Sequence, residues 1–525
     1  MQAVPGTAIT VTNSTDKVDA DTSSVEALQS NPGPDGISLR EAIEATNNDP
    51  GSYAIAFSSA LSGTTITLGQ YLPPLTGGGV SIEGDINGDG TPDVTLVTTL
   101  QEEWSRAIQI ASSGNRLHGL TLQGFAVGVW IDPATGAYGD ELPTHQTLAD
   151  NVISGLAILG FGKFGIWTHS PASPDCGLPM PDPCRTYITF ANTTITDNTI
   201  DARTGIKLVV ANSGDHITGA TVTDNTIRIR DGDEGISVES LGNAGDDGTP
   251  ARISEVLIAR NWIEGTSVVG IQATAGSTRV QGSITEAVRV LDNRVHLVHQ
   301  GSCPCSQGIA LLAGTDASYA IRPDVHPIRY PDGNVLRNVE VAGNRLSGDL
   351  DYGVWVGAGG GGAAGSRNRV LDVVIERNVI SSTIIGRGVY LGVGGADPAL
   401  HRYATGNRIT GVEISANRIS IGRTRPPGFN QWHLDVGGGI VLAGGVNFSR
   451  DGRIRDVRIA KNEIKVKDEA VHGGIKLIGG MSPTARGNRV TCVRLSANSV
   501  SGTRPAVSVR SNIDAKTNYA SLSGC

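Results

Sequence analysis

Ionisable side chains concentrate halfway along the chain, in a combination that suits acid–base chemistry. The concentration consists of Asp201, Arg203, Lys207, Asp231, Asp233, Glu234 and Glu239. Carboxylates that lie close together perturb one another, and this separates the roles of acid and base. We predict Asp233, Glu234, Asp231, Glu239, Asp201 and Lys207 to be catalytic. The alternative is a solvated ladder of charges tied together by lysine and arginine.

The same residues permit elimination from a uronate-containing polysaccharide. Lys207 or Arg203 would then take the proton next to the carboxylate, and Asp201, Asp231 and Asp233 would hold a calcium ion that neutralises it. A lysine beside several carboxylates keeps a high pKa, which weakens it as a base. Of the two reactions, hydrolysis is therefore the preferred prediction.

A second group of oxygen ligands lies near the N-terminus, at residues 85–93 (DINGDGTPD). Side-chain oxygens at alternate positions with a glycine at the sixth resemble the first part of an EF-hand or dockerin calcium loop. We predict a structural calcium ion held by Asp85, Asn87, Asp89 and Asp93 together with the Thr91 carbonyl. The alternative is an Asx-rich turn between two strands.

The elements that position these groups form a repeat. A glycine opens the phrase glycine–aliphatic–any–aliphatic at Gly128, Gly165, Gly205, Gly235, Gly270, Gly308, Gly353, Gly388, Gly439 and Gly474. An asparagine phrase accompanies each one, at Asn151, Asn198, Asn225, Asn261, Asn293, Asn344, Asn378, Asn417, Asn462 and Asn498. Between them lie short alternating apolar runs and no stretch long enough for a helix.

Runs this short bury no face alone, so they must stack turn upon turn around one core. We predict an all-β chain, a right-handed parallel β-helix of about 11–13 coils spaced by ~4.8 Å, with a short N-terminal capping helix. The asparagines are expected at a turn, where Asn tolerates left-handed backbone and bonds to the Asn of the next coil.

In the glycine phrase the two aliphatic residues point inward, so the residue between them points outward. Stacking aligns these outward residues in a column, and stacked exposed rings suit the apolar face of a sugar. The predicted substrate-binding residues on this face are Trp130, Trp167, His169, Arg203, Trp355 and Tyr390. The alternative is that flanking loops cover the rings as a satellite core.

The first hundred or so residues are predicted to form a cap. Ser38 and Glu41 make a capping box, which predicts a helix through Ala45. Residues 36–45 (GISLREAIEA) resemble the "CSLREA" segment that begins many secreted bacterial β-helix proteins. This resemblance implies export and a β-helix behind the cap.

Residues 231–240 (DGDEGISVES) are similar to the acidic segment of polygalacturonase-like glycosidases, which are also right-handed β-helices. The resemblance implies that Asp233 and Glu234 supply the acid and the water-activating base for glycosidic cleavage. On these grounds we expect a cap and first coils at 1–110, the β-helix body at 111–512 and a C-terminal tail at 513–525.

Charge and cysteines limit the possible partners and location. The net charge is −9, and residues 1–110 hold fourteen acidic against three basic residues, so the body is close to neutral. The body shows no basic stripe, and neither nucleic acid nor a membrane surface is expected as a partner. Six cysteines without metal-ligand spacing predict two or three disulfides. They are Cys176, Cys184, Cys303, Cys305, Cys492 and Cys525.

These features together predict a secreted or cell-surface carbohydrate-active enzyme that cleaves a polysaccharide, as a glycoside hydrolase with paired carboxylates. Two alternatives remain: a calcium-assisted polysaccharide lyase, and a non-enzymatic adhesin or structural β-helix. The expected partner is a polysaccharide or oligosaccharide, with no organic cofactor. A homotrimer is left open.

Overall fold

The structure is a computed structural model of the 525-residue chain. It describes residues 6–100, 102–134, 145–170, 187–241, 249–276, 281–298, 306–315, 332–360, 365–394, 403–424, 437–445, 449–481, 484–510 and 518–522. Within these ranges no helix has the length and apolar character that a membrane crossing requires.

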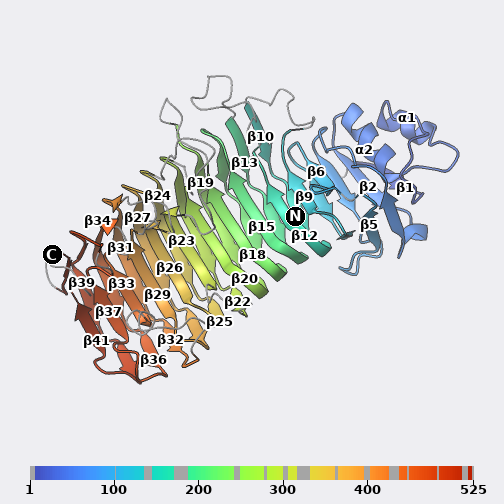
Figure 1. Cartoon of the computed structure of the whole chain (residues 1–525). Coiled ribbons are helices and arrows are strands. Elements are labelled where there is room, and N and C mark those ends of the chain that lie inside the picture. The colour runs from blue at the N-terminus through green and yellow to red at the C-terminus, as the bar shows by residue number, and fades with distance from the viewer. Residues whose placement is uncertain are drawn as a thin grey trace. The chain divides into compact units, whose positions relative to one another are not determined.

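The chain divides into two compact units. The first unit comprises Met1–Val209 and Asp215–Gly232, and the second comprises Val210–Gly214 and Asp233–Cys525. In both units, strands pair in parallel with the equivalent strands of the turns before and after them (Figure 1). Each unit is thus built as a right-handed parallel β-helix, which confirms the predicted fold class.

The first unit begins with the predicted cap, in which helices α1 (Val25–Ser30) and α2 (Leu39–Asn48) lie beside the first strands (Figure 1). The capping box is present, because Ser38 Oγ accepts from the Glu41 amide at 3.2 Å and Glu41 Oε2 accepts from the Ser38 amide at 2.8 Å. The helix runs three residues beyond the predicted end at Ala45.

Behind the cap, the glycine phrases of the first unit lie on β9 (Val127–Ile131), β12 (Ala157–Thr168) and β15 (Thr199–Val210). The strand β6 (Arg106–Ile110) pairs with β9 and has Ala107 in place of the glycine. The aliphatic positions of the phrases are fully buried, as at Val129, Ile166 and Ile206. The alternation therefore places the residue between them on the outer side, as the sequence predicts.

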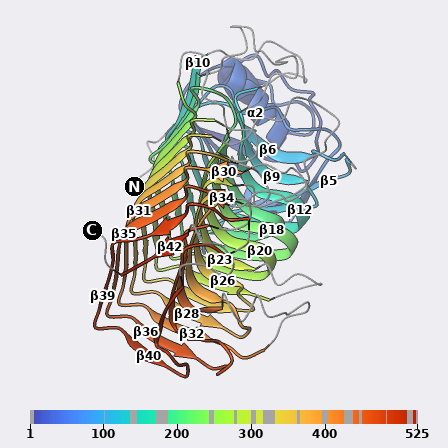
Figure 2. The ribbon, with the colours of Figure 1, turned by 60° about the vertical axis from the view of Figure 1, so that its left-hand side comes forward.

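The second unit repeats this arrangement over more turns. Its glycine phrases lie on or at the start of β18 (Thr226–Ser240), β20 (Trp262–Ala275), β23 (Gln307–Thr315), β26 (Tyr352–Gly360), β29 (Arg387–Val393), β33 (Gly438–Ala443) and β37 (Ile475–Ile478). The strand β41 (Val507–Arg510) follows Ala506 in place of the glycine. A second sheet contains β24 (Val335–Ala342), β27 (Arg369–Glu376), β31 (Arg408–Ser415), β35 (Arg453–Ala460), β38 (Arg489–Val490) and β39 (Val493–Ser496). In Figure 2, β31, β35 and β39 follow one another in successive turns.

The glycines are required by close packing between turns. A Cβ on Gly388 would lie 2.5 Å from the carbonyl oxygen of Gly439 and 2.3 Å from Cγ2 of Ile419. Both contacts are closer than real Cβ atoms approach their neighbours, and the first involves backbone that cannot yield. The repeat therefore keeps glycine where the chain of one turn touches the next.

The asparagines form hydrogen-bonded ladders, as predicted. In the second unit the Oδ1 of each asparagine accepts from the amide and the Nδ2 of the asparagine one turn earlier; Asn378 and Asn417 do so at 2.9 and 3.0 Å. This ladder consists of Asn261, Asn293, Asn344, Asn378, Asn417, Asn462 and Asn498.

Two details of that prediction are wrong. The left-handed residue is the one before the asparagine, as at Arg377 (φ 54°) and Ala416 (φ 54°). Asn151 also belongs to a different ladder, since its Oδ1 accepts from the amide of Asn115 at 2.9 Å. In the second unit that other ladder contains Asn334, Asn368 and Asn407, then Gly452, whose amide donates to Asn488 Oδ1, and then Asn488 and Asn518.

Candidate functional site

The first unit gathers aromatic rings on the outer side of its glycine-phrase strands. Four residues stand opposite one another on successive strands: Gln109, Trp130, Trp167 and Lys207. This is the column that the sequence predicts. We use the name tryptophan face for Trp104, Trp130, Phe164, Trp167 and His169 together.

Stacked rings make up most of this face. The centroids of Trp130 and Trp167 lie 5.1 Å apart with 18° between the ring planes, and Phe164 stacks on Trp167 at 4.6 Å. Trp104 lies 5.9 Å from Trp167 and is 43% exposed, whereas Trp130 is only 8% exposed. On this face Trp130 is therefore buried, Phe164 and Trp167 are half-buried, and Trp104 forms the exposed edge.

The sequence prediction missed Trp104 and Phe164. Trp104 precedes β6 and lies outside any glycine phrase, so the repeat gives no signal for it. Phe164 directly precedes Gly165. Its place next to a repeat glycine is a sequence signal, but the prediction considered only the outward residues that follow each glycine.

His169 is held at the edge of the rings by a carboxylate. Its Nδ1 lies 2.9 Å from Oδ2 of Asp132, and its ring centroid lies 4.6 Å from that of Trp167. Asp132 is buried, and its Oδ1 accepts from the Ala134 amide at 2.8 Å. A carboxylate on one ring nitrogen fixes the tautomer and orientation of a histidine, so Nε2 is the nitrogen that is left for a ligand or a proton transfer.

Cationic side chains cover other parts of the rings. The Arg106 guanidinium lies 4.6 Å from the ring of Tyr71 and 5.4 Å from that of Trp130, and burial lowers its pKa. Burial also raises the pKa of Tyr71 to about 12, helped by a hydrogen bond to Glu102. At the open edge, Lys163 Nζ lies 4.0 Å from the Trp104 ring.

The second unit has a column of the same kind, but this column is closed. Trp355 and Tyr390 stand opposite each other, with Ala310 before and Val441 after them. Tyr390 is 5% exposed and packs with Val441 and Met481, while Trp355 is half-buried. The rings of Trp355 and Tyr390 therefore belong to a satellite core, the alternative that the sequence left open.

A buried arginine lies within this satellite core. Arg387 Nη1 contacts Oδ1 of Asp351 at 2.9 Å, and its guanidinium lies 4.6 Å from the ring of Tyr352. Burial raises the pKa of Tyr352, and it raises that of Tyr390 to about 12. Burial by itself lowers the pKa of Arg387, but Asp351 and the tyrosines raise it overall.

The predicted acid–base cluster is divided between the two units. Asp201, Arg203 and Lys207 lie on β15, and Asp231 lies on β18 (Thr226–Ser240), in the part of that strand that belongs to the first unit. Asp201 Oδ2 forms an ion pair with Arg230 Nη2 at 2.8 Å.

The other three carboxylates, Asp233, Glu234 and Glu239, belong to the second unit. Asp233 is exposed and Glu234 half-buried. Glu239 is buried, and its Oε1 accepts from Ser237 Oγ and, at 3.3 Å, from Gln272 Nε2. The catalytic roles of the cluster stay predictions.

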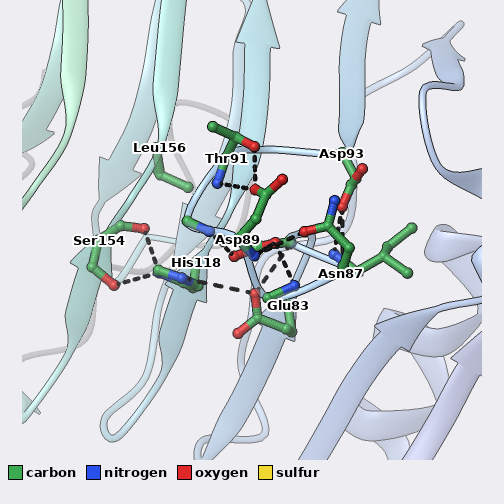
Figure 3. A network of polar contacts seen from close by, with 12 residues as sticks. Glu83, Asn87, Asp89, Thr91, Asp93, His118, Ser154 and Leu156 are labelled. Atoms are coloured by element: carbon green, nitrogen blue, oxygen red, sulfur yellow. Dashed lines mark hydrogen bonds and ion pairs between the residues drawn. The ribbon is translucent and has the colours of Figure 1, made fainter.

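The predicted calcium loop forms a closed turn (Figure 3). Asp85 Oδ1 accepts from the Gly88 amide at 2.8 Å, and Asp93 Oδ2 accepts from the Ile86 amide at 2.8 Å. Asp89 accepts from the amide and hydroxyl of Thr91, which lowers its pKa. Backbone amides thus already occupy the carboxylates. Among the described residues, no three His, Cys, Asp or Glu side chains are arranged to hold a metal ion.

The structure tests the predicted disulfides at one of the six cysteines. The described part of the chain contains Cys492, which is buried and is not a free thiol. The other five cysteines, Cys176, Cys184, Cys303, Cys305 and Cys525, lie outside the described residues.

No family model and no curated protein matches this chain. Solved structures do match it. The A-module of mannuronan C-5 epimerase AlgE6 of Azotobacter vinelandii is 13% identical over 91% of this chain and 96% of that chain, with a TM-score of 0.40. The catalytic unit of a GH87 α-1,3-glucanase from Streptomyces thermodiastaticus is 13% identical over 94% and 69%, with a TM-score of 0.44.

A third match is PfbA, a surface adhesin of Streptococcus pneumoniae, which is 11% identical over 91% of this chain and 90% of that chain, with a TM-score of 0.42. The titles of the three structures describe an epimerase, a glucanase and an adhesin. What this chain has in common with them is the course of the backbone, and its function has to be argued from its own side chains.

Proposed function

We propose that the protein binds a polysaccharide on the tryptophan face of its first unit. The observation that carries this proposal is the stacked pair Trp130–Trp167 with the exposed ring of Trp104 beside it. Aromatic planes pack against the apolar faces of sugar rings, and a polar rim supplies hydrogen bonds to the hydroxyls. His169 and Lys163 provide such a rim.

We further propose that the protein cleaves a polysaccharide by hydrolysis. Lys207 stands next to Trp167 in the register, so a glycan lying along the column passes over β15, which also carries Asp201. Asp233 and Glu234 are the proposed acid and water-activating base. In the elimination alternative Asp201 would bind calcium, but Asp201 is already neutralised by Arg230, and this favours hydrolysis.

Export to the cell surface or the medium belongs to the same proposal. Cys492 is not a free thiol, and disulfides persist in oxidising compartments. Comparing the mass of the exported, alkylated protein with and without prior reduction tests this. Six alkylated cysteines without reduction would contradict it.

The binding proposal is tested with a pair of tryptophan substitutions. Trp104 and Trp262 are both 43% exposed, but Trp104 belongs to the tryptophan face and Trp262 packs against Arg294 in the second unit. Trp104→Ala should weaken binding of the best glycan from a polysaccharide panel about tenfold, because it removes one stacking surface. Trp262→Ala should leave the affinity within about twofold. Equal effects of the two substitutions would refute the site.

A further inference from the structure

Four arginines stand above one another on the second sheet of the second unit. They are Arg369, Arg408, Arg453 and Arg489, which begin β27, β31, β35 and β38 and oppose one another in the strand register. We use the name arginine ladder for these four residues. Neighbouring parallel strands lie ~4.8 Å apart, so the arginines recur at that interval.

The ladder is exposed and carries no counter-charge. All four side chains are exposed, and within the described part of the chain none of them has an ion pair or a side-chain hydrogen bond. Other arginines of this unit differ, since Arg418 pairs with Glu463 at 3.0 Å and Arg458 with Glu413 at 3.4 Å. Guanidinium groups at this spacing repel one another, and a bound anion would relieve the repulsion.

The backbone under the ladder is fixed by the second asparagine ladder. Arg369 and Arg408 each follow a fully buried asparagine, Asn368 and Asn407, and the Asn368 amide donates to Asn407 Oδ1 at 2.9 Å. The amides of Arg408 and Arg453 donate to the carbonyls of the preceding turn at 2.9 Å. The spacing of the four side-chain origins is therefore set before any ligand arrives, which reduces the entropy lost on binding.

Further arginines lie next to the ladder, on β35 and β39. Arg455 pairs with Asp456 at 3.3 Å and Arg458 with Glu413 at 3.4 Å, whereas Arg494, opposite Arg458 in the register, has no ion pair among the described residues. The prediction that the body has no basic stripe is wrong at this face. Successive members of the ladder are 36 to 45 residues apart in the sequence, so only the stacking of the turns brings them together.

We propose that the arginine ladder binds a linear anionic polysaccharide with one carboxylate or sulfate on each sugar, laid across the strands. A guanidinium presents a planar fork that matches both groups in a bidentate way. One pyranose unit advances a glycan chain by a length similar to the strand spacing, so successive anionic groups reach successive arginines.

The side chains beside the ladder favour a glycan over a nucleic acid. The residues two positions beyond the four arginines are Leu371, Thr410, Arg455 and Thr491. None is aromatic, whereas proteins that bind single strands stack the bases on aromatic rings. Among the described residues, the ring in register with the ladder is that of Tyr519, which opposes Arg489 at its end.

The proposal is tested by binding of the full-length protein to polygalacturonate, dextran sulfate and unmodified dextran, with a single-stranded oligodeoxynucleotide alongside. The test variant is Arg408→Gln/Arg453→Gln. The matched control is Arg345→Gln/Arg418→Gln, which removes the same charge from two exposed arginines. Each of them also follows an asparagine of a ladder, but Val379 lies between them in the strand register, so they are not adjacent.

We expect the protein to bind polygalacturonate, dextran sulfate or both, and not to bind dextran. The affinity should fall as the salt concentration rises, because binding releases counterions from the anionic polysaccharide. The ladder variant should lose affinity about tenfold and show a shallower salt dependence, while the control stays within about twofold. Absence of binding to both anionic glycans, equal losses in the two variants, or a preference for the oligodeoxynucleotide would overturn the proposal. The two proposals are tested separately, because Trp104→Ala leaves the arginine ladder intact. If glycan binding at the tryptophan face is refuted, the result for the arginine ladder still stands.

Discussion

Arg387 illustrates what single residues contribute to the outer column. Its side chain is 2% exposed and is enclosed by the rings of Tyr352 and Tyr390, with Asp351 as its ionic partner. A charge removed from water needs such a partner, since desolvation costs several kcal/mol per ion. The guanidinium therefore holds the rings of Tyr352 and Tyr390 around it and keeps this part of the column closed.

Replacing this arginine should be costly. Arg387→Met removes the charge partner of Asp351 in a water-poor site and should lower the free energy of unfolding by about 3–5 kcal/mol. Arg418→Met breaks an ion pair with Glu463 in which both side chains are largely exposed, so it should cost less than about 1 kcal/mol. Urea unfolding of the two variants and the wild type measures both values, and similar small losses would contradict the role given to Arg387.

Loops and strands differ in how far the sequence specifies them. The glycine and asparagine phrases are set by contacts between neighbouring turns, so strands, columns and the capping box could be predicted from local pattern. The loop at 85–93 has the composition of a calcium loop, but the same oxygens also satisfy backbone amides, and composition does not decide between the two. Calcium binding there remains our proposal.

That proposal makes a prediction for the loop. Calcium should raise the melting temperature of the wild-type protein by several degrees through preferential binding to the folded state, and magnesium should do so less. Asp89→Asn keeps an oxygen to accept from Thr91 but removes a charge, so it should abolish the calcium effect. An unchanged melting temperature of the wild type in calcium would leave the loop as an Asx-rich turn.

At the scale of the whole molecule, the two units present different surfaces. The first unit carries the tryptophan face, and the second unit carries the arginine ladder on its other sheet. The column of Trp130 and Trp167 could be predicted because each ring follows a repeat glycine. The position of Phe164 directly before Gly165 is a similar signal, whereas Trp104 lies outside any glycine phrase and could not be predicted from the repeat.

The sequence also did not predict which outward residues of the glycine phrases are buried and which are exposed. Trp167, Trp355 and Tyr390 have the same place in the glycine phrase, yet Trp167 and Trp355 are half-buried, whereas Tyr390 is only 5% exposed beside Val441 and Met481. Whether an outward residue meets solvent depends on side chains from other turns, and the phrase itself does not encode them.

The measurement that tests the central claim most directly is a screen of the purified protein against plant, algal and bacterial polysaccharides. Reducing ends and the ultraviolet absorbance of unsaturated uronates are followed together. Our account predicts that one polysaccharide yields reducing ends without absorbance, and that Asp233→Asn or Glu234→Gln lowers the rate about a thousandfold or more while the protein stays folded. Absorbance rising with the reducing ends would contradict hydrolysis in favour of elimination, and full turnover in both variants would contradict the acid–base assignment. Silence across the panel, with glycan binding retained, would instead identify a binding protein without catalytic activity.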